Sequence, residues 1–188
     1  MKVAIYGGTF DPIHLGHLRV AEAALEVVDK VILVPSNVQP FKTKKPKGSS
    51  IKHRTAMLKL VTLAHDIGNL RWADVEIKRG GISYTIDTVR FFKEYYKDAE
   101  LYLIVGSDCV ADFHKWRAPK TIRKLAKILI APREESLTAF SLIGETLPMA
   151  TGIASTDIRA RVKEERSIKY MVPESVEKYI RDNNLYKE

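Results

Sequence analysis

The feature that most constrains the fold is an alternation between short apolar runs and segments with helical periodicity. The runs are apolar on both faces, as in strands of a parallel sheet covered by helices on each side. This order predicts a doubly wound, mainly parallel α/β sheet whose ligand cleft lies beyond the carboxyl ends of the strands, where the strand order reverses. We expect strands at residues 3–6, 31–34, 70–75, 101–105 and 128–131.

The segments between these runs carry apolar residues every three to four positions, which is typical of helices that bury one face. They predict helices around residues 18–28, 57–64 and 85–96. A last helix should open at Pro173 and Glu174, because proline is tolerated at the first helical position and an acid there meets the positive end of the dipole. With 188 residues and 45% apolar side chains, we expect one domain spanning residues 1–188 with a small C-terminal helical part.

The composition excludes several classes of protein. No apolar run of about 18 residues is present for a membrane span, and no secretory signal is recognisable, so we expect a cytoplasmic protein that does not bind membranes. Cys109 is the only cysteine, which rules out an internal disulfide or a thiolate zinc cage. The net charge of +8 fits nucleic acid, an anionic membrane surface or small phosphorylated substrates. No aromatic residue interrupts the basic run at 42–47, although single-strand binders usually place aromatic rings between their cations.

A glycine and histidine block follows the first strand. Gly7 and Gly8 let backbone N–H groups approach a phosphate closely, although an ordinary sharp turn would also use them. His14 and His17 stand three apart at a helix start, where both rings can face one anion. Metal ligation is the weaker reading, since no carboxylate lies at helical spacing beyond them. Neither G-x-G-x-x-G nor a Walker motif is present, which disfavours NAD-binding and P-loop folds.

The block from Gly7 to His17 resembles the G-G-T-F-D-P-x-H-x-G-H block of bacterial nicotinate-nucleotide adenylyltransferases. Residues 155–159 are similar to the second block of this family, S-T-x-I-R, residues 83–88 to its S-Y-T-x-D-T, and residues 106–108 to its G-x-D. The first block alone marks the wider HxGH nucleotidyltransferase superfamily. The combination, in this order and at this chain length, is specific to the nicotinate branch.

This resemblance implies a Rossmann-like nucleotidyltransferase fold and a role in NAD biosynthesis. The expected reaction transfers AMP from ATP to nicotinate mononucleotide and gives deamido-NAD and pyrophosphate. Such chemistry needs positioning and electrostatic stabilisation more than covalent catalysis. Mg²⁺ would bridge the ATP phosphates without a protein cage, so we expect no metal-binding residues.

The resemblance also implies site residues. His14, His17 and Arg159 would be catalytic. The ATP-binding residues would be Gly7, Gly8, Thr9, Phe10, Gly106, Asp108, Ser155 and Thr156, and the acceptor-binding residues Lys42, Tyr84, Thr85 and Trp116. Lys42 matches the basic residue of the family's P-P-H-K, but Phe41 stands here in place of the histidine.

Several alternatives remain open from the residues alone. Ser155 with Thr156, and likewise Asp108, could simply cap helices, and Trp116 could anchor the core. Another HxGH enzyme, using nicotinamide mononucleotide or phosphopantetheine, is the nearest competing function. A basic nucleic-acid-binding domain is a more distant one, because no recognised binding motif is present.

Overall fold

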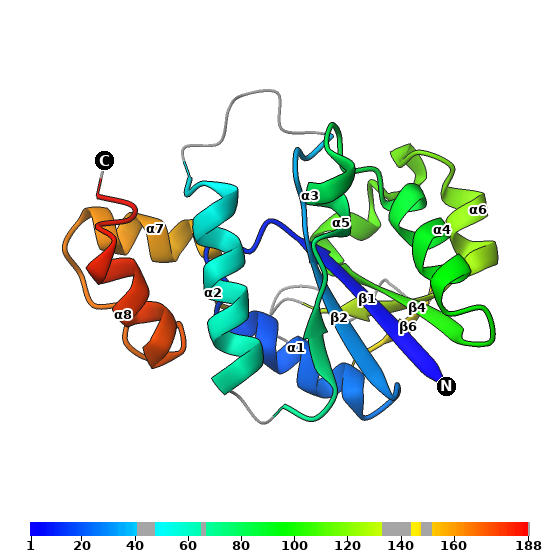
Figure 1. Ribbon diagram of the computed structural model, residues 1–188, viewed down its shortest axis with the longest axis horizontal. Coiled ribbons are helices and arrows are strands. Elements are labelled where there is room, and N and C mark those ends of the chain that lie inside the picture. The colour runs from blue at the N-terminus through cyan, green and yellow to red at the C-terminus, as the bar shows by residue number, and fades with distance from the viewer. Residues whose placement is uncertain (41–47, 65–66, 133–143, 148–151, 188) are drawn as a thin grey trace.

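The computed structural model describes residues 1–40, 48–64, 67–132, 144–147 and 152–187 and contains a parallel sheet of six strands in the order β3-β2-β1-β4-β5-β6 (Figure 1). The predicted doubly wound α/β fold is therefore confirmed, and the strand order reverses between β1 and β4. The strands are β1 (Lys2–Gly8), β2 (Lys30–Pro35), β3 (Leu70–Trp72), β4 (Glu100–Gly106), β5 (Lys127–Ala131) and β6 (Glu145–Thr146).

All five expected strands form, but the third is shorter than predicted. It ends at Trp72, and the residues that the sequence suggested would extend it lead into a short helix, α3 (Val75–Arg79). The two-residue strand β6 was not predicted. It has exposed polar residues and no apolar pattern, and is defined only by its pairing with β5.

The four predicted helices are α1 (Leu15–Leu25), α2 (Ile51–Ala64), α4 (Thr85–Tyr95) and α8 (Glu174–Asp182). Pro173 is the N-cap of α8 and not its first residue. The remaining helices are α5 (Ser107–Val110), the 3-10 helix η1 (Phe113–Lys115), α6 (Pro119–Leu125) and α7 (Ser155–Lys163). Figure 1 shows α4 and α6 on one side of the sheet, with α1, α2, α7 and α8 on the other.

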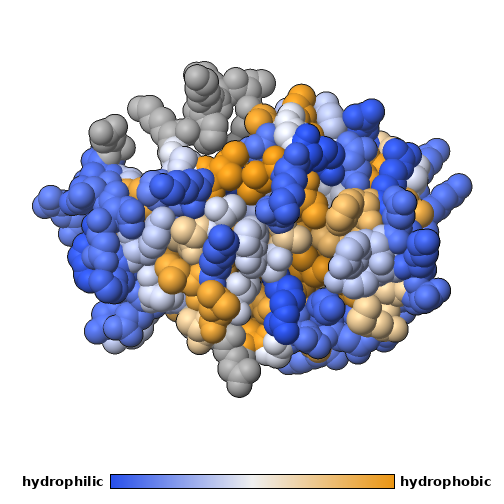
Figure 2. Space-filling model, in the orientation of Figure 1, coloured by the Kyte–Doolittle hydropathy of each residue, from blue (hydrophilic) through white to orange (hydrophobic). Residues whose placement is uncertain are grey.

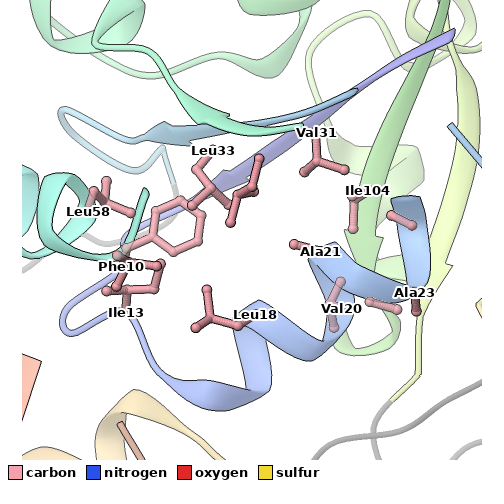
Figure 3. Close-up of a cluster of buried hydrophobic side chains, with 14 of the residues drawn as sticks. Phe10, Ile13, Leu18, Val20, Ala21, Ala23, Val31, Leu33, Leu58 and Ile104 are labelled. Atoms are coloured by element: carbon pink, nitrogen blue, oxygen red, sulfur yellow. The ribbon is translucent and has the colours of Figure 1, made fainter. Parts of the chain in front are cut away.

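The sheet divides the core into two parts because successive strand residues point to opposite faces. In β1, Ala4 packs with the α1 and α2 side, whereas Val3 and Ile5 pack with the α4 and α6 side. Figure 3 shows part of the first cluster, in which Phe10 lies close to Leu33 and Leu58. Each fully buried aliphatic or aromatic side chain stabilises the fold by about 1.5–3 kcal/mol relative to an exposed one.

The surface is largely polar at the two ends of the molecule. Figure 2 shows hydrophilic residues over the α7 and α8 end and over the α6 end, with hydrophobic residues gathered between them. Among the helices of the described residues, none combines the length and apolarity that crossing a membrane requires.

Candidate active site

The sequence predicts a ligand site at the switch point between β1 and β4. Polar side chains do gather there. The loop after β1 leads into α1, and the end of β4 leads into α5. A small cavity of about 40 Å³ lies between them, lined by His14, His17 and Gly106 together with residues of β5 and its exit. In doubly wound sheets a ligand binds at this position, beyond the carboxyl ends of the strands.

His14 and His17 form a stacked pair at the start of α1. Their ring centroids are 3.6 Å apart with an interplanar angle of 25°. Each ring accepts, at Nδ1, the backbone N–H of the other residue at 3.3 Å, which completes a capping box. A neutral imidazole that accepts at Nδ1 carries its proton on Nε2. Both rings are therefore held as Nε2–H donors, a form suited to phosphate oxygens.

The backbone conformations of the loop after β1 differ from those that its two glycines suggested. Neither Gly7 nor Gly8 has a positive φ; the left-handed residue is Phe10, with φ 50°. A Cβ on Gly8 would lie 2.9 Å from the Phe10 ring, so glycine is needed there for close packing, while a Cβ on Gly7 would meet no described atom within 4 Å. Phe10 was expected to bind ATP, but the whole residue is only 1% exposed and its ring packs in the core, so its role in ATP binding stays a prediction.

The start of α7 lies against the same loop, although it is far away in the sequence. Arg159 Nη1 donates to the Asp11 carbonyl oxygen at 2.7 Å, and Ser155 Oγ donates to the Pro12 carbonyl oxygen at 3.0 Å. The structure thus brings Arg159 to the turn that directly precedes His14. The alternative in which Ser155 caps the helix is wrong: Ala154 is the N-cap, and the Ser155 hydroxyl bonds to the loop.

Asp108 and Gly106 lie at the end of β4. Asp108 is exposed in the first turn of α5, whose N-cap is Gly106, so the helix-cap alternative for Asp108 is also wrong. An ideal Cβ on Gly106 would lie only 2.5 Å from Asp108 Oδ1. Glycine at this position leaves room for the carboxylate to fold back over the strand end, beside the cavity.

The predicted acceptor residues lie on the α4 side. Tyr84 is the N-cap of α4, no side chain among the described residues caps that helix, and Thr85 is its first residue. The guanidinium of Arg117 lies 4.8 Å from the centre of the Tyr84 ring, and Tyr84 and Trp116 pack against the same buried cluster. Trp116 is half-buried and packs against Phe113 at 5.1 Å, so part of its surface is open to a ligand. Lys42 lies outside the described residues.

Other polar residues at the site were not predicted. Asp11, 4% exposed, accepts hydrogen bonds at Oδ1 from Ser49 Oγ at 2.6 Å and from Tyr186 Oη at 2.7 Å. Burial, together with the Asp11 charge, raises the pKa of Tyr186 well above its usual value. Arg54 is buried beside this group and bonds to two backbone carbonyls. Asp11 lies within the block of residues 7–17, but no local sequence signal marks Ser49, Arg54 or Tyr186 as its neighbours, because they come from distant segments.

Known proteins share both the sequence and the fold of this chain. The cytidylyltransferase-like family matches residues 5–161. A probable nicotinate-nucleotide adenylyltransferase of Thermoanaerobacter sp. (strain X514) is 39% identical over 204 residues, covering 100% of this chain and 95% of the relative. One from Dictyoglomus thermophilum is 39% identical over 198 residues, covering 99% of this chain and 100% of the relative.

Two solved structures share the fold at lower identity. Nicotinic acid mononucleotide adenylyltransferase of Plasmodium falciparum, complexed with NaAD, superposes with a TM-score of 0.83 at 21% identity, over 98% of this chain and 97% of the other. A putative nicotinate-nucleotide adenylyltransferase of Vibrio parahaemolyticus gives 0.77 at 22% identity, over 100% and 96%. The curated relatives match this chain over at least 99% of its length. The chain therefore belongs to the nicotinate-nucleotide adenylyltransferase family.

Proposed function

We propose that the protein transfers the AMP group of ATP to the 5′-phosphate of nicotinate mononucleotide, in the cytoplasm, as a step of NAD biosynthesis. An oxygen of the acceptor phosphate attacks the α-phosphorus of ATP, and the bond from that phosphorus to the β-phosphate oxygen breaks. The products are deamido-NAD and pyrophosphate. The observation that carries this proposal is that Arg159 binds the Asp11 carbonyl, three residues before His14 of the stacked His14–His17 pair.

These groups suit the charge that develops on the phosphates. His14 and His17 supply neutral Nε2–H donors, and the N-terminus of α1 adds the positive end of the helix dipole. Arg159 uses one of its five N–H donors on the Asp11 carbonyl, and its planar fork matches the geometry of a leaving pyrophosphate. Asp108, exposed at the end of β4, would accept hydrogen bonds from the ribose hydroxyls of the adenosine.

The choice of a nicotinate acceptor rests on the start of α4. The first backbone N–H groups of this helix, around Thr85, favour an anion such as the nicotinate carboxylate. Trp116 offers a partly open aromatic ring beside it, on which a pyridine ring can stack. Nicotinamide carries no charge and would not gain from the helix dipole.

ATP would enter as its Mg²⁺ complex. Phosphate oxygens and water are the ligands that Mg²⁺ usually keeps, so the ion would be carried by the triphosphate. The ion would neutralise charge on the triphosphate. Chelation by EDTA should abolish turnover, and added Mg²⁺ should restore it.

The test is a pyrophosphate-release assay with ATP, Mg²⁺ and one acceptor at a time. We expect kcat/KM for nicotinate mononucleotide to exceed that for nicotinamide mononucleotide by at least about tenfold, or about 1.4 kcal/mol in transition-state binding. A preference for the nicotinamide form, or for phosphopantetheine, would overturn the acceptor assignment. Failure to release pyrophosphate with any acceptor, together with salt-dependent retention on DNA, would favour a nucleic-acid-binding domain instead.

A further inference from the structure

Arg54 is a buried cation in the first turn of α2, and its side chain donates hydrogen bonds to two backbone carbonyls. The residue is only 5% exposed. Burying a guanidinium is costly unless its N–H groups are bonded and its charge is compensated. Desolvation lowers the pKa of Arg54, and the nearby Asp11 carboxylate opposes that shift.

The two ends of the guanidinium fork bind two different loops. Nη1 donates to the Thr9 carbonyl oxygen at 2.7 Å, and Nη2 donates to the Ser36 carbonyl oxygen at 2.8 Å. Thr9 lies in the loop that follows β1, and Ser36 directly follows β2. A single lysine ammonium lacks the rigid planar fork that holds both carbonyls at a fixed separation.

The loop after β2 is in turn tied to the acceptor side. The Asn37 N–H donates to Ser83 Oγ at 2.8 Å, Asn37 Nδ2 donates to the Gly81 carbonyl oxygen at 2.8 Å, and the Ser83 N–H donates to the Val38 carbonyl oxygen at 2.8 Å. Ser83 is followed by Tyr84 and Thr85, at the start of α4. A continuous chain of hydrogen bonds therefore runs from Thr9 through Arg54 to the acceptor loop.

We propose that Arg54 is a positioning residue that fixes the ATP-binding loop relative to the acceptor-binding loop, acting through the Thr9 and Ser36 carbonyls. The inference rests on the proposed function and assigns no contact between Arg54 and the reacting atoms. A pocket of about 280 Å³ lies between the two loops, with Thr9, Ser36, Asn37 and Arg54 in its lining. In-line transfer depends on the separation of the reacting atoms, and a misplacement of about 1 Å costs about 100-fold in rate.

The experiment compares Arg54→Ala and Arg54→Lys with Val61→Ala in the full-length protein. Val61 is fully buried in the same helix, two turns away, so its truncation destabilises α2 without touching either carbonyl. We expect Arg54→Ala to lower kcat by about 100-fold while the KM for ATP changes by less than about threefold. Arg54→Lys should stay well below the wild type, and Val61→Ala should lower Tm but leave kcat unchanged at temperatures where it is folded.

Chemical rescue separates positioning from general stability. Guanidinium ion at tens of millimolar should restore the kcat of Arg54→Ala at least about tenfold, because it can donate to both carbonyls, whereas methylammonium should not. Val61→Ala should show no rescue. If Arg54→Ala retains a kcat within about threefold of the wild type, or if Val61→Ala loses as much kcat, the positioning role is overturned.

A variant outside α2 keeps the test decisive if Arg54 variants do not fold. Ser83→Ala removes the hydroxyl that accepts from Asn37 and should lower kcat/KM for the acceptor about tenfold with an unchanged KM for ATP; an unchanged acceptor kcat/KM would overturn the proposed link. The wild-type assay distinguishes the two proposals. A wild type that releases no pyrophosphate refutes the proposed function, whereas an active wild type with equally active Arg54 and Ser83 variants refutes only the positioning role.

Discussion

Replacing Tyr186 with phenylalanine removes one hydroxyl from the hydrogen-bond cluster that ties the C-terminus to the loop after β1. Tyr186 Oη donates to Asp11 Oδ1 at 2.7 Å and lies 3.2 Å from Ser49 Oγ. Asp11 also carries the carbonyl that Arg159 binds. The substitution keeps the ring and its packing, so the change in stability reports on the hydroxyl alone.

The size of the effect follows from the bond that is lost. A hydrogen bond to a charged group contributes about 1.5–3 kcal/mol, and because Tyr186 is half-buried we take the lower end, about 1.5 kcal/mol. For a chain of this length, each kcal/mol shifts Tm by about 2–4 °C. Tyr186→Phe should therefore lower Tm by about 3–6 °C near neutral pH.

The pH dependence supplies a second signature. The pKa of Tyr186 is raised, mainly by burial and then by the Asp11 charge. Its contribution is complete below the unfolded-state pKa of about 10, and is lost as the pH rises above that value, because the unfolded chain then releases the proton that the folded chain retains. The stability gap between wild type and Tyr186→Phe should narrow by up to about 1.4 kcal/mol per pH unit above pH 10.

The assay is urea unfolding at a series of pH values between about 7 and 11. Tyr170→Phe is the matched control: Tyr170 is 78% exposed, and loss of its hydroxyl should change stability by less than about 0.5 kcal/mol. Equal stability of wild type and Tyr186→Phe near neutral pH would refute the reasoning. So would a gap that stays constant through the alkaline range.

Three further predictions concern the site. His17→Ala should lower kcat by at least about 100-fold. Because it also removes half of the α1 capping box, it should reduce the free energy of unfolding by about 1 kcal/mol, while the circular dichroism spectrum stays native. Arg159→Lys should reduce kcat at least about tenfold, because a point charge replaces the planar fork at the leaving pyrophosphate; a kcat equal to the wild type in pyrophosphate release would contradict this role. Trp116→Ala should raise the KM for nicotinate mononucleotide if the ring stacks on the pyridine. If the packing of Trp116 on Phe113 dominates, the variant should instead lower Tm with an unchanged KM. Steady-state kinetics and thermal melting of this one variant decide between the two roles.

The sequence was most informative where structure is encoded locally. The apolar runs predicted every long strand, and the periodic segments predicted α1, α2, α4 and α8. Its errors were at short elements. The α3 helix replaced the end of a predicted strand, and α6 begins after Ala118 in a left-handed conformation; such elements form because the sheet and neighbouring helices pack against them, and their own residues carry too little periodicity to show it.

The sequence by itself determined the parallel sheet, the position of the site at the switch point, and the pairing of His14 with His17. Burial patterns and helix starts depend on residues only a few positions apart, so a local pattern is enough to predict them. The family resemblance implied that Arg159 acts at this site, but only the tertiary structure decided which atoms it binds there. Arg159 reaches the Asp11 carbonyl across 148 residues, and Tyr186, which no pattern indicated, reaches the same residue across 175. In the sequence, nothing distinguishes Arg54 from other arginines on helices. In the fold, the segments that follow β1 and β2 bring two carbonyl oxygens within hydrogen-bond distance of its guanidinium. These partners depend on how separately folded elements pack, and no short-range pattern records that packing.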